Sequence, residues 1–435
     1  MLKYLAIFLT GVVVSLYYFP FEFSFLPGIN TKMGLAVVGL VVALYKLIQK
    51  KTPGIPKNVF EIFAVAVVVS LIGLTSVVFN NTPDYAYATY FVSMCVWLSA
   101  AFVTCSLIKY VHGDLTIERV TIYVTTVCVF QCIMALIIDS NMAVKSFVDA
   151  YIMQDQKMLT ELERIYGIGA SLDVAGVRFS ACLILLVYVL NKNKDKMNNM
   201  QILSAILAYV VITVVGNMVA RTTIVGVGLS LFYAFLTFRA NRVSSSFFRL
   251  FRVALAVLVV VLPCCVYLYN NNLQFHELSR FAFEGFFNYV EDGEWHVDSN
   301  ERLKTMIVFP DNAKTWIIGD GYFTNPYDTD PTYVGYQPGG FYMGTDIGYL
   351  RFIFYFGFIG LFAFSSFFVV VAKNCIKKLP EHKMLILFIL LLGFVIWLKV
   401  ATDVFLVFAL LLCVADLKEE EGESVPQISS TDCES

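Results

Sequence analysis

The sequence predicts an all-α protein that crosses a membrane about twelve times. Of its 435 residues, 58% are apolar and 15% are charged, whereas a soluble domain is about half apolar and about a quarter charged. Twelve apolar segments each approach the roughly 20 residues that a spanning helix needs. They begin near Leu2, Gly34, Val59, Ala88, Val120, Val174, Ile202, Thr222, Val253, Ile347, Leu385 and Val404. This composition excludes a soluble enzyme, a disordered chain and a nucleic-acid-binding protein.

The first and last segments need separate arguments. Residues 1–19 have the composition of a signal peptide, but no small-x-small cleavage site follows them, so we expect them to remain as a membrane anchor. The last two segments both fall within residues 385–417, and a single tilted helix over that range is the alternative.

The distribution of Lys and Arg predicts the orientation and the division of the chain. With both termini in the cytoplasm, most short loops that are rich in Lys and Arg are cytoplasmic, as the positive-inside rule requires. Residues 1–269 then contain nine membrane helices with an outer loop at 139–173, residues 270–345 form a large outer loop, and residues 346–417 contain three more helices. The acidic segment 418–435 is expected to be a disordered cytoplasmic tail. Eight of the ten cysteines lie in apolar segments, so no disulfide framework is predicted.

The first outer loop is predicted to hold two helices. The spacing of five apolar residues matches one helix face and predicts an interfacial helix. These residues are Val144, Phe147, Val148, Tyr151 and Ile152. A second short helix is predicted over 158–167, because Gly167 suits a helix C-terminus.

The second outer loop is long enough that a functional role is expected. Its segment "SNERLKTMIVFP" predicts a helix that Asp298 caps and Pro310 ends. The segment "WIIGDGY" predicts a short extended piece with a turn at Gly319 and Gly321.

Three arginines interrupt apolar helices near the outer leaflet: Arg178, Arg221 and Arg351. A buried arginine costs a few kcal/mol and usually marks a functional site, although snorkelling to the head groups is the alternative for each one. Because a guanidinium binds phosphate through two parallel hydrogen bonds, three arginines at one depth predict a diphosphate clamp.

The composition of the large loop suggests further contacts. The loop has 11 acidic and four basic residues, so Arg280 and Arg302 are candidates for specific anion binding, with ordinary solvated surface as the alternative. Aromatic rings interleaved with polar groups suit a sugar surface, and packing onto the membrane is the alternative. The sugar-binding candidates are Trp295, His296, Trp316, Asp320 and Tyr322.

Proton transfer would fall to a carboxylate of the same loop. Asp346 and Glu301 are the catalytic candidates, and a helix N-cap is the alternative role for Asp346. Asp328 and Asp330 give only a weak signal for a cation, so neither a metal nor another cofactor is expected.

Three stretches of sequence together resemble the O-antigen polymerase (Wzy-type) family of the O-antigen polymerase and ligase superfamily. They are "NMVARTTIVGVGLSLF" with Arg221, "NERLKTMIVFPDNAKTWIIGDGYF" with Arg302, and "TDIGYLRFIFYFGFIGLF", which Asp346 opens. Ligases of this superfamily carry a histidine just ahead of the matching helix, whereas this chain reads "GTDIGYLR" there, which favours a polymerase.

The resemblance implies a GT-C-like glycosyltransferase of the bacterial inner membrane with its active site on the periplasmic face. Such a polymerase transfers a growing glycan from undecaprenyl diphosphate onto a lipid-linked repeat unit, and Arg221 and Arg302 would be its diphosphate-binding arginines. A chain-length regulator protein is expected as a partner only through this resemblance. An O-antigen ligase and a flippase or transporter of lipid-linked oligosaccharides are the alternatives, although transporters usually place polar groups at the midplane. An oligosaccharyl- or mannosyl-type transferase is less favoured, because the first outer loop offers only Glu22 instead of an acidic pair.

Overall fold

The computed structural model describes residues 2–49, 57–154, 159, 164–240, 245–335, 337–338 and 340–423. A helix lies at each of the twelve predicted segments, so the all-α architecture is confirmed. These helices are α1 (Leu2–Tyr18), α2 (Thr31–Ile48), α3 (Lys57–Asn80), α4 (Tyr90–His112), α5 (Ile117–Ser140), α8 (Leu172–Asn193), α9 (Asn199–Val219), α10 (Thr223–Ala240), α11 (Ser245–Asn271), α17 (Gly348–Lys378), α18 (Lys383–Ile396) and α19 (Phe405–Glu423).

Within the described residues, seven helices are long and apolar enough to cross a membrane: α3, α4, α5, α8, α9, α11 and α17. Helices α1, α2, α10 and α19 are apolar over shorter lengths, and α18 has 14 residues. Residues 385–417 thus hold two helices separated by a connection, and the single tilted helix is excluded.

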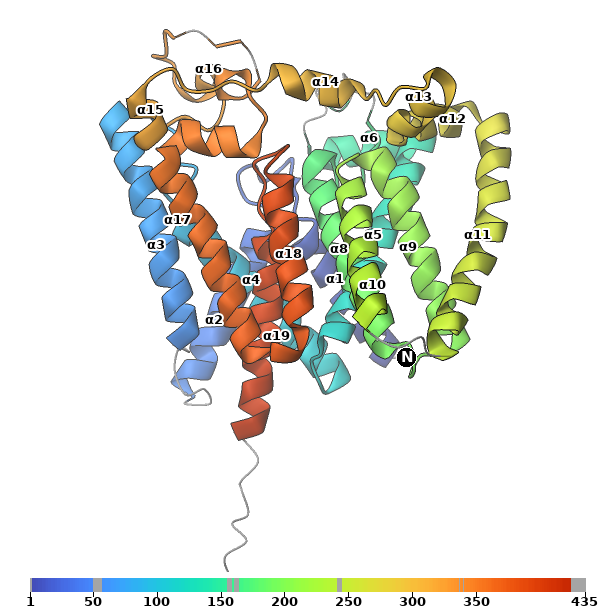
Figure 1. Cartoon of the computed structure of the whole chain (residues 1–435). Helices are drawn as coiled ribbons and strands as arrows, with labels where there is room; N and C mark the ends of the chain where they lie inside the picture. The colour runs from blue at the N-terminus through green and yellow to red at the C-terminus, as the bar shows by residue number, and fades with distance from the viewer. Residues whose placement is uncertain are drawn as a thin grey trace, which may run out of the picture.

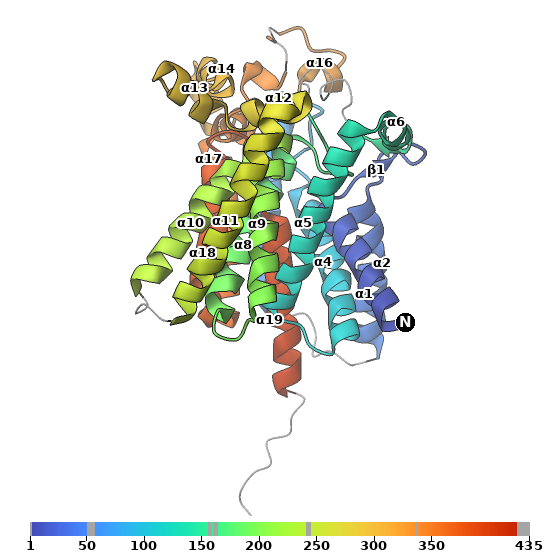
Figure 2. The same ribbon diagram turned by 90° about the vertical axis from the view of Figure 1, so that its right-hand side faces the viewer.

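The helices form one bundle with two different ends (Figure 1). We call the end at which α1 begins and α19 finishes the terminal end. The opposite end, here the loop end, carries five short α-helices among the described residues of the large loop. They are α12 (Leu273–Ala282), α13 (Glu284–Asp292), α14 (Asp298–Thr305), α15 (Ala313–Ile317) and α16 (Pro326–Thr329). Figure 2 shows that α6 (Met142–Tyr151) and the strand β1 (Glu22–Phe23) also lie at the loop end.

Helix α8 forms the centre of the bundle, and α5, α9, α10 and α18 pack around it. Most of its residues are buried, from Ala175 to Leu190. Beside this group, α17 packs against α3 and α19 against α4. A helix, α6, is present at the predicted segment and begins after the N-cap Asn141, but Ile152, which the spacing predicts on its apolar face, lies in a strand. The strand β2 (Ile152–Met153) follows α6 and pairs antiparallel with β1.

Helix α17 is broken at Phe356 and Gly357, and the break anchors the large loop. Gly357 has φ +68°, which an L side chain rarely adopts. The interruption frees two carbonyl oxygens that a continuous helix would use internally. Phe354 O accepts from the backbone N–H of Asp320 at 2.6 Å, and Tyr355 O accepts from that of Gly321 at 3.1 Å. Residues 319–321 are therefore held against the bundle by backbone hydrogen bonds.

Several local predictions need correction. Helix α14 ends at Thr305, before Pro310, and its N-cap position is Val297, so Asp298 is the first helical residue and no cap. Trp316 and Ile317 are helical in α15, while the turns at Gly319 and Gly321 are confirmed by positive φ angles.

Two further predictions concern segments that the structure describes only in part. Of the helix expected over 158–167, residues 158 and 160–163 lie outside the described residues, and 164–167 are not helical. Residues 418–423 continue α19 rather than starting a disordered tail, and 424–435 lie outside the described residues.

Candidate functional site

Asp346 and Arg351 form an ion pair where the large loop enters α17. The Asp346 carboxylate lies 3.8 Å from a guanidinium nitrogen of Arg351. Ile347, not Asp346, occupies the N-cap position of α17, so the capping alternative is wrong. Burial raises the pKa of the Asp346 carboxyl above its usual range, and Arg351 opposes this effect.

Aromatic rings and a carbonyl group hold the Arg351 guanidinium in place. Its carbon lies 3.9 Å from the centroid of Phe323 and 3.5 Å from that of Phe341, which are cation–π distances. The side chain also donates to Phe323 O at 3.1 Å. These contacts hold the positive charge of Arg351 at the point where the large loop joins α17.

A second ion pair joins the connection between α18 and α19 to α8. The Lys399 ammonium donates to Asp173 Oδ1 at 2.9 Å and to the hydroxyl of Thr222 at 3.1 Å, and that hydroxyl in turn donates to Asp173. Neither Lys399 nor Asp173 was among the predicted site residues. Lys399 stands out in the sequence only as a base in the short turn between the last two apolar segments.

The third element of the site is built around the ring of Phe281 in α12. The guanidinium carbons of Arg164 and Arg221 lie 3.9 Å and 4.3 Å from its centroid. Arg221 also pairs with Glu284 of α13. Burial and the neighbouring Arg221 lower the pKa of Arg164 to about 10. Two guanidinium groups are thus held near each other on one ring. The Glu284 carboxylate pairs with one of them and so links the large loop to the bundle.

Electrostatic interactions connect these three elements. Asp346 interacts with Asp173 and Lys399 as well as with Arg302 of α14, and Asp173 interacts with Arg164. We call this group the charged cluster. It comprises Arg164, Asp173, Arg221, Glu284, Arg302, Asp346, Arg351 and Lys399. With five bases and three acids, the cluster has an excess of positive charge at the loop end.

Two arginines of the charged cluster retain unused donors. The Nε atoms of Arg221 and Arg351 are buried and have no hydrogen-bond partner among the described residues. Buried polar groups are normally paired, and an exception needs an explanation.

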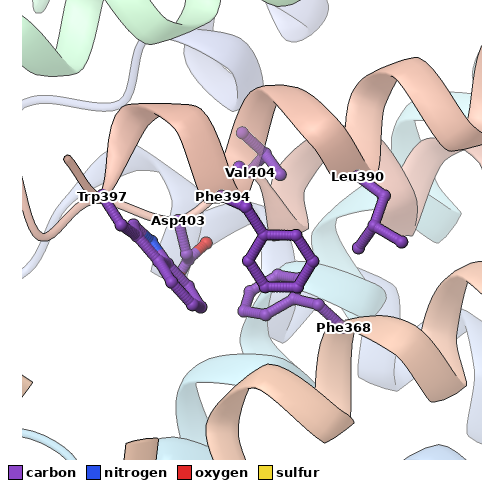
Figure 3. Close-up of a pocket in the computed structure, with 7 residues that line it drawn as sticks. Phe368, Leu390, Phe394, Trp397, Asp403 and Val404 are labelled. Carbon is purple, nitrogen blue, oxygen red and sulfur yellow. The ribbon is translucent and has the colours of Figure 1, made fainter. Parts of the chain in front are cut away.

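Arg178, the third arginine predicted for this group, lies deeper in the bundle. Its charged neighbours are Lys32 and Asp403, and its guanidinium carbon lies 5.6 Å from the Phe19 centroid. Figure 3 shows Asp403 beside Trp397, with Phe368, Phe394 and Val404 around them. The space that these residues enclose is too small for a water molecule. The structure therefore places Arg178 in a buried network beneath the charged cluster.

Two of the three remaining charged candidates, Arg280 and Glu301, form pairs within the large loop. Arg280 makes two hydrogen bonds to Glu291, at 2.8 Å and 2.6 Å. Glu301 pairs with Lys304, three residues away on α14, at 2.7 Å. Arg302 on the same helix is exposed, and its link to the charged cluster is its interaction with Asp346.

The sugar-binding candidates divide into two groups at the loop end. Trp295 packs against Phe286, and the neighbouring His296 donates from Nε2 to the Asp298 carboxylate at 3.0 Å. The second group, Trp316, Asp320 and Tyr322, lies in α15 and in the segment that follows it. The predicted sugar surface is thus split between the two halves of the large loop.

In the second group, Trp316 stacks on Phe358 of α17 at 4.9 Å. Asp320 accepts from Thr315 Oγ1 and pairs with Lys314, both at 2.7 Å. The Tyr322 hydroxyl donates to Asp330 at 2.6 Å. Burial and this hydrogen bond together raise the pKa of Tyr322.

Asp84, which no sequence pattern indicates, holds the second group in position. Its Oδ2 accepts from the backbone N–H of Phe323 and Thr324, both at 2.9 Å, and from the Thr324 hydroxyl at 2.8 Å. Since Phe323 also stacks on Arg351, Asp84 indirectly positions one side of the charged cluster.

The described residues contain no group of three or more His, Cys, Asp or Glu side chains that could hold a metal ion. Asp330 instead accepts from the backbone N–H and hydroxyl of Thr332 as well as from Tyr322. Its carboxylate therefore has a structural role in the loop.

Comparison with family models, curated proteins and solved structures gives no match to this chain.

Proposed function

We propose that the protein is a polysaccharide polymerase, a glycosyltransferase that transfers a growing glycan from undecaprenyl diphosphate onto a lipid-linked repeat unit. The observation that carries the proposal is the convergence of Arg164, Arg221, Arg351 and Lys399 beneath a large loop, with Arg302 near them. Guanidinium and ammonium groups stabilise the charge of a departing diphosphate. The resemblance described above points to the same chemistry.

In the proposed reaction, a sugar hydroxyl oxygen attacks the anomeric carbon of the donor glycan. The bond from that carbon to the diphosphate oxygen breaks, and the diphosphate leaves with the electron pair. The hydroxyl proton passes to a carboxylate. Asp346 suits this role better than Glu301, because its pKa is raised by burial and it lies beside Arg351.

Both substrates would reach the loop end from the bilayer, where their lipid chains remain. We propose a bacterial inner membrane with the loop end on the periplasmic side and both termini in the cytoplasm. The aromatic and polar side chains on either side of α14 would then contact the sugars of the donor and acceptor.

The test is a reaction with purified full-length protein in liposomes that contain lipid-diphosphate repeat units, with products separated on a gel. We expect a ladder of polymers with and without a chelator. Arg221→Gln and Arg351→Gln should each reduce the yield by about 10²-fold, as the loss of an electrostatic donor does. Arg119→Gln is the matched control, because Arg119 pairs with Asp114 near the start of α5.

Three outcomes would contradict the proposal. Equal yields from Arg221→Gln and the control would show that the charged cluster takes no part in the reaction. Transfer of the repeat unit across the liposome membrane without polymer would indicate a flippase. Transfer to a lipopolysaccharide core, with no ladder from repeat units alone, would indicate a ligase.

A further inference from the structure

A groove between α9 and α11 lies in the half of the bundle near the terminal end, away from the charged cluster. Its volume is about 670 Å³, which is within the usual range of small-molecule sites. Both walls are mainly apolar. The apolar lining consists of Met200, Leu203 and Leu207 from α9 and Val253, Ala256, Val257, Val260 and Val261 from α11.

The polar residues that line the groove gather at one end of it. Asn199 is the first residue of α9, and Arg249 and Arg252 belong to the first two turns of α11. Among the described residues that line the groove, two are arginines and none is acidic. The groove is therefore basic at the terminal end and apolar towards the middle of the bundle, as a site for an anionic amphiphile would be.

Arg249 is fixed in position but incompletely paired. Its guanidinium donates to the carbonyl oxygen of Lys194, at the C-terminus of α8. Its Nε atom is buried without a hydrogen-bond partner among the described residues. Arg252 lies three residues further along α11 and is exposed, so the two guanidinium groups lie on neighbouring turns of one helix face.

Helix α11 is exposed on the outside of the bundle over most of its surface. Its main contact with the bundle is α9, through residues such as Val257 against Ile202 and Ile206, and Figure 1 shows it at the edge of the bundle. Large apolar side chains on its other faces are exposed, among them Leu258 (56%) and Val259 (64%). In a membrane these surfaces contact lipid, so lipid has direct access to the groove.

We infer that this groove binds one anionic phospholipid of the surrounding bilayer. The phosphate would accept hydrogen bonds from Arg249 and Arg252, and an acyl chain would occupy the apolar part between α9 and α11. The site stabilises the packing of α11, the helix that carries the large loop through its contact with α12. It is separate from the proposed diphosphate site.

The test uses the full-length protein in detergent, incubated with phosphatidylglycerol or with phosphatidylcholine, and measures retained lipid by native mass spectrometry. We expect one retained phosphatidylglycerol and much less phosphatidylcholine. The Arg249→Gln/Arg252→Gln variant should retain about tenfold less phosphatidylglycerol, which corresponds to about 1.4 kcal/mol. Lys373→Gln/Lys377→Gln removes two exposed charges near the end of α17 and should retain as much as the wild type.

A second variant tests the apolar part without changing charge. Ala256→Trp fills the groove and should also lose the lipid, and equal thermal unfolding would show that both variants fold. The inference is overturned if the arginine variant retains as much phosphatidylglycerol as the lysine control, or if Ala256→Trp binds like the wild type. Equal retention of phosphatidylcholine, or displacement of the lipid by inorganic phosphate, would also overturn it.

Discussion

Lys399 and Asp173 are 226 residues apart in the sequence, yet their side chains meet at 2.9 Å at the loop end. The pair ties the connection after α18 to the first turn of α8. It also places a positive charge near Asp346. One contact therefore joins the C-terminal helices to the centre of the bundle and contributes to the charged cluster.

Removing the ammonium of Lys399 should destabilise this connection. We expect Lys399→Gln to lower the free energy of unfolding by about 1–3 kcal/mol, because the half-buried Asp173 carboxylate then loses its ion-pair partner. Asp173→Asn in the same chain should recover part of this loss. Unfolding in detergent of both single variants and the double variant measures the interaction, and purely additive effects would mean that the pair contributes nothing.

The ring of Phe281 should matter for activity through the two guanidinium groups that it contacts. Phe281→Leu keeps an apolar side chain but removes the aromatic face, so about 0.5–1 kcal/mol should be lost for each cation–π contact. We expect a lower polymer yield and weaker binding of the lipid diphosphate. Phe147→Leu is a suitable control, because Phe147 packs on Tyr151 of α6 instead of an arginine. A similar loss in both variants would indicate a general effect of removing an aromatic ring at the loop end.

The sequence predicts the helices well because each helix at a predicted span is a nearly continuous apolar segment. The sequence also identifies Arg221 and Arg351, because an isolated basic residue in an apolar segment is conspicuous. Arg178 has the same appearance but lies in the interior beside Asp403, and sequence alone does not distinguish an interior ion network from a ligand site.

The partners of these arginines could not be predicted in the same way. Asp173, Glu284 and Lys399 come from three distant parts of the chain, and no periodicity connects them. Asp84 lies in the sequence "NTPDY", which has the composition of an ordinary turn, although it holds the backbone near Phe323. Packing of the loop against the bundle decides these contacts, and packing is not encoded in local pattern.

Asp84→Ala should loosen the second half of the large loop. The change leaves three donors near Phe323 and Thr324 without their acceptor, which costs about 1–3 kcal/mol for a buried group. We expect faster limited proteolysis between Gly321 and Thr345 and a lower polymer yield. Asp195→Ala, at an exposed position after α8, should change neither. Equal protection in both variants would show that Asp84 does not anchor the loop.

Gly357→Ala should disturb the break in α17. A Cβ atom at this position would lie 2.1 Å from Ile317 O, in a backbone conformation with φ +68°. With ψ at −173°, this backbone conformation is one that only glycine normally adopts, so it alone costs about 1–3 kcal/mol for an L residue, and the contact requires α15 to move. We expect a lower unfolding temperature together with reduced activity. Gly228→Ala is the control, since a Cβ there meets nothing within 4 Å.

Asp346 should make both stability and activity depend on pH. Because burial raises its pKa in the folded protein, the folded state binds more protons than the unfolded state between the ordinary aspartate pKa of about 3.9 and the raised value. Stability should therefore fall as the pH rises through this window and be constant above it. Activity should change in the opposite direction, because a carboxylate must be ionised to accept the hydroxyl proton.

Asp346→Asn should flatten the stability profile and abolish polymer formation, whereas Glu301→Gln should preserve both profiles. Unfolding and polymer yield measured from about pH 4 to about pH 8 check this, and an unchanged activity profile in Asp346→Asn would assign the proton acceptor to another group.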